Sequence, residues 1–213
     1  MTIYTNYALG LQLSHRVLTR NLHRFAAFDQ ADSLPADFGD YLRLFLEFLE
    51  VHHDGEERSL FPALRRNAAG RSTDAAHLDR WTSDHREIGR LHDELAKISS
   101  ALTSADARGA VVVRSRDLLA VLQPHVDDEE AVLTPQRLAE MIPERELAAA
   151  TDEVARANRS RALTMASFLA TSLDPKEQAS LFGNAPWLFR RVLLPISKRR
   201  MRRFHDIVQG GVA

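Results

Sequence analysis

Apolar residues along the first 140 or so positions recur every three or four residues in four separate stretches, as they do on one face of an α-helix. Segments rich in Asp, Ser, Gly and Ala separate the stretches, at 29–40, 67–75 and 103–106. Few windows alternate with a period of two, so little or no β-strand is expected. The four stretches are Leu11, His15, Leu18, Leu22 and Phe25; Leu42, Leu46, Leu49, His53, Glu57, Leu60 and Leu64; Leu78, Trp81, His85, Ile88, His92 and Leu95; and Val111, Ser115, Leu118, Leu122, His125, Glu129 and Val132.

The pattern predicts an all-α protein with two parts. Because four amphipathic helices are joined by short connections, we expect residues 1–142 to form an antiparallel up-down-up-down four-helix bundle. Residues 143–213 are expected to form a C-terminal helical extension that ends in a basic tail. Within it the pattern predicts one amphipathic helix over 144–173 and a short helix from Pro175. Pro195 is expected to divide the tail, because proline interrupts helical hydrogen bonding.

An internal repeat of histidines and carboxylates lies on the four apolar stripes. A histidine on the first or third stripe is followed 38 or 40 residues later by a second histidine, which has a glutamate four residues further on. Residues at i and i+4 share one helix face, so both side chains should point into the bundle. The alternative is that these residues are surface ion pairs or hydrogen-bonded core histidines. The predicted metal ligands are His15, His53, Glu57, His85, His125 and Glu129.

Six such ligands favour a dinuclear metal site. Two buried carboxylates without partners would cost several kcal/mol each, and cations would offset that cost. Mixed imidazole and carboxylate ligands suit iron, manganese or zinc, but six are too many for one tetrahedral zinc ion. The ferritin-like arrangement needs a carboxylate from every helix, and residues 1–28 contain no Asp or Glu. Two iron ions therefore fit best, and manganese stays an alternative.

At these residues the sequence resembles the hemerythrin-like (HHE cation-binding) family, in its H-HxxxE-H-HxxxE subset. The matching segments are HHDGEERSLFPAL, SDHREIGRLHDEL and PHVDDEE, and the resemblance covers about residues 8–140. It implies a four-helix bundle with an oxo- or hydroxo-bridged di-iron centre, whose two glutamates bridge the ions. Members of the family bind O2, sense oxygen or iron, or handle peroxide and nitric oxide.

One position departs from the oxygen carriers of that family. They have a histidine four residues after the helix-three ligand, where this chain has Gly89. Water or Asp54 would fill the place. We therefore expect reaction with a small oxidant (O2, hydrogen peroxide or nitric oxide) in a redox-protective, peroxidase- or catalase-like role. The alternative is a non-enzymatic iron or oxygen sensor, or an O2-binding protein, that signals through its extension.

Three residues near the predicted ligands are not predicted to bind metal. His52 points about 100° away from His53 around a helix, so it is not assigned as a ligand. His92, two turns beyond His85, is expected to be a core histidine. Tyr7 precedes the first stripe, within reach of the open end of the site.

Composition and charge set the remaining expectations. The chain has 213 residues and no cysteine, which excludes disulfides and thiol chemistry. No signal-peptide pattern or apolar run of about 18 residues is present, so a cytoplasmic protein is expected. Residues 186–205 carry seven Lys or Arg and no acid, whereas 1–185 carry 21 basic and 28 acidic residues. We expect this tail to pair with the acidic body. A membrane surface is the less favoured alternative, and no nucleic-acid module is visible.

Overall fold

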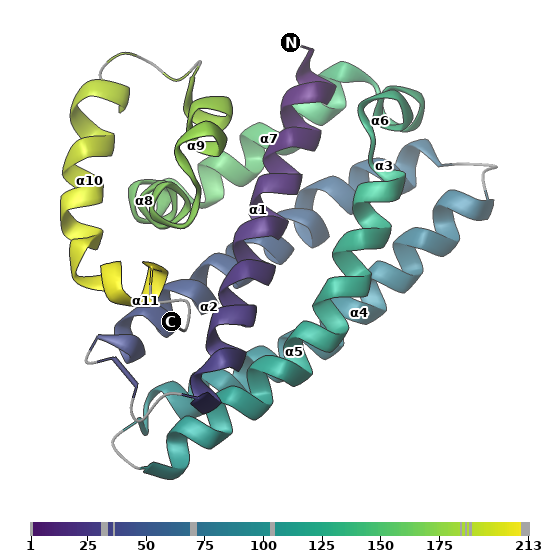
Figure 1. Cartoon of the computed structure of the whole chain (residues 1–213). Helices are drawn as coiled ribbons and strands as arrows, with labels where there is room; N and C mark the ends of the chain where they lie inside the picture. The colour runs from purple at the N-terminus through teal and green to yellow at the C-terminus, as the bar shows by residue number, and fades with distance from the viewer. Residues whose placement is uncertain are drawn as a thin grey trace.

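A computed structural model describes residues 2–30, 34–35, 37–68, 72–102, 105–183, 185, 187 and 189–209, and these contain helices and turns but no strand. Figure 1 shows a bundle of long helices flanked by shorter C-terminal ones. The prediction of an all-α fold is confirmed. The elements are α1 (Ile3–Ala26), η1 (Ala27–Gln30), α2 (Phe38–Gly55), η2 (Glu56–Leu60), α3 (Phe61–Asn67), α4 (Ser72–Ser99), α5 (Ala105–Val132), α6 (Pro135–Met141), α7 (Glu144–Ala157), α8 (Ala162–Ser172), α9 (Pro175–Phe182), η3 (Phe189–Leu193), α10 (Leu194–Arg200), η4 (Met201–Phe204) and α11 (His205–Gln209).

The four long helices α1, α2, α4 and α5 form the body of the molecule. Helix α1 contacts α2 and α5, and α4 contacts the same two helices, so the four close into a ring. The predicted stripes face its interior, because burying their side chains removes apolar surface from water. Leu18, Leu22 and Leu118 are fully buried there. Among the described residues, no helix is long and apolar enough to cross a bilayer.

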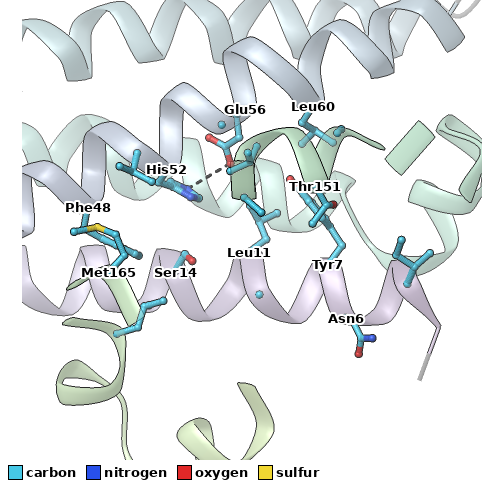
Figure 2. Close-up of a pocket in the computed structure, with 18 residues that line it drawn as sticks. Asn6, Tyr7, Leu11, Ser14, Phe48, His52, Glu56, Leu60, Thr151 and Met165 are labelled. Atoms are coloured by element: carbon cyan, nitrogen blue, oxygen red, sulfur yellow. Dashed lines mark ion pairs between the residues drawn. The ribbon is translucent and has the colours of Figure 1, made fainter. Parts of the chain in front are cut away.

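A π-helical segment, η2, interrupts the second predicted stripe. Its wide turn is closed by the Phe61 amide, which donates to the Glu56 carbonyl five residues earlier. A π turn inserts an extra residue, so the side chains within it rotate relative to a regular α-helix. Glu56 is consequently buried and 3% exposed, and it points toward His52 in Figure 2. The Glu57 side chain is 35% exposed, whereas the stripe had placed Glu57 inside.

The segment predicted as one helix over 144–173 is two helices, so that prediction is wrong. Helix α7 ends at Ala157 and α8 begins at Ala162. Between them the sequence is Asn-Arg-Ser-Arg. The Asn158 side chain donates to the Val154 carbonyl at 3.0 Å, which satisfies a carbonyl at the helix end and favours termination.

The later predictions for the extension agree with the structure in part. Helix α9 begins at Pro175 as predicted, behind a capping box formed by Asp174 and Glu177. Pro195, by contrast, does not divide the tail as predicted. The π segment η3 runs directly into α10, of which Pro195 is the second residue, so the chain changes from π to α geometry there and stays helical.

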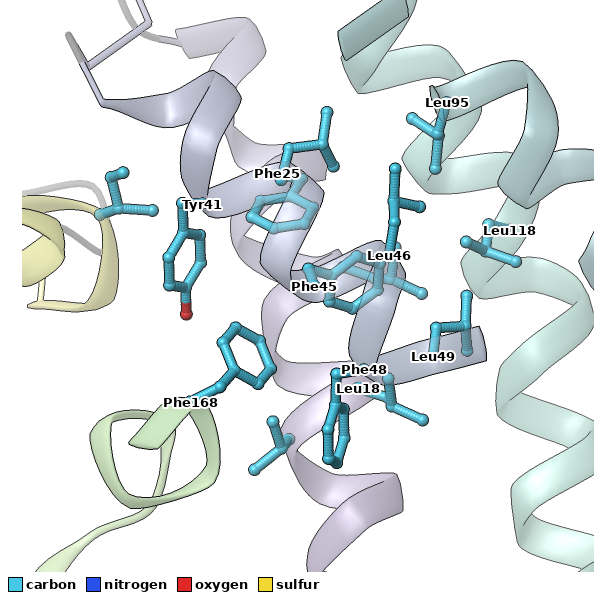
Figure 3. Close-up of a cluster of buried hydrophobic side chains, with 14 of the residues drawn as sticks. Leu18, Phe25, Tyr41, Phe45, Leu46, Phe48, Leu49, Leu95, Leu118 and Phe168 are labelled. Atoms are coloured by element: carbon cyan, nitrogen blue, oxygen red, sulfur yellow. The ribbon is translucent and has the colours of Figure 1, made fainter. Parts of the chain in front are cut away.

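The extension shares one hydrophobic core with the bundle. Figure 3 shows Tyr41 of α2 next to Phe168 of α8, and their ring centroids lie 5.5 Å apart. Phe204 packs on the same tyrosine at 5.3 Å. Arg203 pairs with Asp40 at 2.8 Å, so part of the tail meets the acidic body as expected. An apolar face of the tail nevertheless stays exposed, formed by Trp187, Val192, Leu193 and Ile196.

Glu177 ties α9 to α1. Its carboxylate accepts hydrogen bonds from Arg16 at 2.7 Å and from Arg20 at 3.1 and 3.2 Å. It also accepts the Asp174 amide at 2.8 Å. Burial alone would raise the pKa of Glu177, but the hydrogen bonds from Arg20 and Arg16 outweigh it and hold the pKa at about 2.

We predict that Glu177→Gln lowers the free energy of unfolding by about 2 kcal/mol near neutral pH, because it removes charge-assisted hydrogen bonds. Since the folded pKa lies below the usual value of 4.5, this stability is present above pH 4.5 and is lost as the pH falls toward 2. Urea denaturation at a series of pH values measures the difference. Asp79→Asn, at an exposed pair with Arg65, is the control and should change little. A pH-independent difference would contradict the assignment.

Candidate metal centre

Histidines and glutamates from α1, α2, η2, α4 and α5 converge in the interior of the bundle. Among the described residues, their ligand atoms form three overlapping groups, each within 4.8 Å. Each ligand-bearing helix is held by its apolar stripe, so its inward residues arrive at the same level of the bundle. The groups are His53, His85 and His125; His15, His52 and Glu56; and Glu56, His85 and Glu129.

Glu129 lies between one histidine of its own helix and one of another. Its Oε2 is 3.3 Å from Nε2 of His15 and 3.5 Å from Nε2 of His125. The side chains of His15, Glu129 and His125 are at most 2% exposed. This arrangement places a carboxylate between two imidazoles in a water-free setting.

Glu56 repeats this arrangement in the other half of the bundle. Its Oε1 is 3.4 Å from Nε2 of His52, four residues earlier in the chain, and its Oε2 is 3.6 Å from Nε2 of His85. Nε2 of His85 also lies 3.0 Å from Nε2 of His125. The two halves therefore meet through the histidines of α4 and α5.

A second pair of carboxylates binds the outer nitrogens of two histidines. Nδ1 of His15 lies 3.0 Å from Glu130, and Nδ1 of His85 lies 2.9 Å from Glu57. Such partners fix the ring so that its other nitrogen faces inward. For His15, burial alone would lower the pKa, but the contacts with Glu129 and Glu130 outweigh it and the pKa is raised.

The structure brings together five of the six predicted ligands. His15, His53, His85, His125 and Glu129 all belong to the groups, but Glu57 belongs to none of them. His52 and Glu56 belong to them although the sequence analysis assigned neither as a ligand.

The sequence contains a signal that pairs His52 and Glu56 with His125 and Glu129. The string Glu-Glu-x-x-Leu-x-Pro begins at Glu56 and again at Glu129, 73 residues later. The same offset relates His52 to His125. An alignment on this string, rather than on the apolar stripe, pairs His52 and Glu56 with His125 and Glu129. The π turn in η2 realises that register.

The centre contains buried polar atoms that lack hydrogen-bond partners within the described part of the chain. They are Nε2 of His15, His52 and His53, and both carboxylate oxygens of Glu56 and of Glu129. A buried polar atom without a partner costs free energy, and for an ionised carboxylate the cost is several kcal/mol. Cations bound between these atoms would offset the cost, so this donor set fits bound metal.

Without a metal ion, burial favours the uncharged forms of Glu56, His52, His53 and His85. Burial raises the pKa of Glu56 well above its usual range, and the nearby Glu129 raises it further. Burial lowers the pKa of His52 and His53 well below the usual value, and neighbouring imidazoles add to the effect. For His85, burial and two neighbouring histidines lower the pKa to about 3. Neutral imidazoles are the form that binds metal.

A polar cavity of about 290 Å³ reaches the centre between α2 and α4. His53, His85 and Gly89 line it, and a Cβ atom added to Gly89 would meet nothing within 4 Å. Asp54 also lines it and pairs with Arg58 at 2.9 Å, but it belongs to none of the three groups. The cavity also contacts His92, which the sequence analysis had expected in an apolar layer.

Comparison with known proteins identifies one family. The family model described as the hemerythrin HHE cation binding domain matches residues 10–137, which is more than half of the chain and includes every group of the centre. Neither the curated proteins nor the solved structures give a significant match.

We predict that the metal-free protein loses stability as the pH falls below about 6.5. The folded pKa of His85 is about 3, against a usual value of 6.5 for histidine. Between these values the unfolded chain binds a proton that the folded chain does not, so unfolding becomes easier as the pH falls. Urea denaturation of the metal-free protein across this range tests the slope. His85→Gln should reduce it, whereas substitution of the exposed His23 by Gln should not. An unchanged slope in His85→Gln would disprove the assignment.

Proposed function

The chain belongs to the hemerythrin HHE cation-binding family, and we propose that it holds two iron ions and reacts with a small oxidant. The oxidant would be O2, hydrogen peroxide or nitric oxide, in a redox-protective or peroxidase-like role. The observation that carries the proposal is the set of buried imidazole and carboxylate atoms without hydrogen-bond partners among the described residues. Iron suits this mixed nitrogen and oxygen donor set, and manganese is the alternative.

The proposed ligands follow the two equivalent halves of the centre: each half contributes a histidine from α1 or α4 and a histidine–glutamate pair at i and i+4. His53 stays a candidate ligand, because its Nε2 lacks a partner within the described part and lies near His85 and His125. We assign Glu57 to orienting His85. The proposed set is His15, His52, Glu56, His85, His125 and Glu129.

Two bound iron ions would supply electrons to the oxidant, and the residues of this chain would shape that chemistry in two ways. Glu130 and Glu57 accept the Nδ1 hydrogens of His15 and His85 and so direct the Nε2 lone pairs inward. Gly89 leaves room beside the centre in the polar cavity, through which a small oxidant would enter.

A sensor role is the second candidate, and one contact favours it. Helix α7 of the extension contacts η2, the segment that contains Glu56. Metal binding adds its free energy to the folding of the segments that hold the ligands. A loss of metal that loosened η2 would therefore also loosen α7. Limited proteolysis that cuts residues 143–213 only in the metal-free protein, without appreciable peroxide turnover in the loaded protein, would favour this role.

Three further expectations from the sequence belong to the proposal. The up-down-up-down order is supported by the contacts of α1 with both α2 and α5. The division into a bundle over 1–142 and an extension over 143–213 is supported by Pro143, which is the N-cap residue of α7. A cytoplasmic location is supported by the absence of cysteine from the sequence.

We predict two iron ions per chain, measured by metal analysis of the purified protein. His52→Ala and Glu56→Gln should lose most of the iron, because each removes a proposed ligand. Glu57→Gln should keep both ions but weaken binding by about 10- to 100-fold, as expected for a residue that orients a ligand. Glu50→Gln, a half-exposed position on α2, is the control. One iron ion per fully loaded chain would contradict the dinuclear centre. If Glu57→Gln lost all of the iron while Glu56→Gln kept it, Glu57 rather than Glu56 would be the ligand, as the apolar stripe predicts.

We predict that Gly89→His slows peroxide consumption and tightens iron retention. The new imidazole lies at i+4 from His85, on the same helix face, and enters open space in the polar cavity. The measurement compares peroxide consumption at matched iron content. Gly109→His is the control, because Gly109 is also an open helical position but lies outside this cavity. Equal rates for wild type and Gly89→His would show that this position does not face the exchangeable site.

A further inference from the structure

A second, larger cavity opens between the bundle and the extension. It lies among α1, α2, η2, α7 and α8 and has a volume of about 490 Å³, within the range of sites that hold small organic molecules. Its walls are mainly apolar, and Figure 2 shows side chains from α1, α2 and the extension facing one space. The apolar wall includes Leu11, Phe48, Val51, Leu60, Met165 and Leu169.

This cavity reaches the metal centre from a different side than the polar cavity does. His52 and Glu56 line it, and Figure 2 marks their ion pair. Both are proposed metal ligands with buried atoms that lack hydrogen-bond partners in the described part. An occupant of the cavity would therefore lie against the ligands of one half of the centre.

The charges around the cavity select an uncharged occupant. The described residues that line it include no Lys or Arg, so a negatively charged group would find no cationic side chain there. Most of the wall is apolar, so a charged occupant of either sign would lose its hydration without gaining a partner on that wall.

Gly10 keeps the cavity open on the α1 side. A Cβ atom added there would meet nothing within 4 Å. Glycine inside a helix costs about 1 kcal/mol relative to alanine, so the open space comes at a cost to helix stability. A side chain at position 10 would start in open space, so a large one would occupy part of the cavity.

We propose that this cavity is a binding site for an uncharged, apolar organic molecule, which it holds against the His52–Glu56 side of the centre. Binding of the organic molecule depends only on the cavity. The contact of that molecule with a metal-loaded centre rests on the proposed function. The occupant is a small organic molecule, because a volume of about 490 Å³ matches sites of that class.

The test uses the whole chain, metal-free and iron-loaded, with the fluorescent apolar amine N-phenyl-1-naphthylamine as the probe. The probe should bind saturably and be displaced by 1-decanol. Decanoate, which has the same chain length and a negative charge, should displace it about tenfold less well or worse, a difference of about 1.4 kcal/mol. Gly10→Phe should lower probe affinity about tenfold or more, and Gly109→Phe, at an open position outside the cavity, should not.

Circular dichroism and the midpoint of thermal unfolding establish that both variants fold. If Gly10→Phe does not fold, Ala155→Trp replaces it, because Ala155 lines the cavity at an exposed position of α7. Absence of saturable binding, equal displacement by decanol and decanoate, or unchanged affinity in the filled variant would each overturn the proposal. Failed probe binding in a chain that carries two iron ions overturns the cavity proposal alone. Probe binding in a chain that takes up no iron overturns the proposed function alone.

Discussion

The architecture depends on two carboxylates, Glu56 and Glu129, that lie in the bundle interior without hydrogen-bond partners among the described residues. An isolated charge in such a place is too costly to keep, so the groups must be protonated or matched by cations. The surrounding imidazoles do not donate hydrogen bonds to these oxygens, but their nitrogens lie within 3.3 to 3.6 Å. The apolar stripes bring the four helices together. The buried carboxylates of the centre make the stability of the bundle depend on protons or bound cations.

Much of this could be predicted from the sequence, because both the helices and the ligands follow regular spacings. The stripes located the four long helices, and the repeated histidines located the level of the centre. The apolar stripe predicts that Glu57 points inward with His53, as in a regular α-helix, whereas its side chain is 35% exposed. The π turn in η2 is a local backbone feature that an apolar period does not reveal. The same limitation applies at Asn158, where a side-chain hydrogen bond ends a helix that the apolar period alone would continue.

The extension is more than an appendage to the bundle. Phe168 and Phe204 pack on Tyr41, and Met165 belongs to the same core cluster. Helix α7 approaches the bundle closely beside the centre: a Cβ atom at Gly55 would lie 3.2 Å from the Val154 side chain. Gly55 therefore permits a close approach of α7 to the last turn of α2. Because these helices bridge over α1 and α2, they enclose space next to the centre that a bare four-helix bundle would leave open to water.

The two outer carboxylates connect this interior to the surroundings. Glu57 and Glu130 each bind a buried imidazole on one side, and their side chains are 35% and 34% exposed. Each is thus in contact with both the centre and bulk solvent. Dissolved ions screen charges that lie more than about 10 Å apart at moderate salt, and they screen closer, partly buried pairs much less. The contacts of Glu130 with His15 and of Glu57 with His85 are 3.0 and 2.9 Å long, so added salt would weaken other surface ion pairs while leaving the orientation of these two almost completely covered rings unchanged.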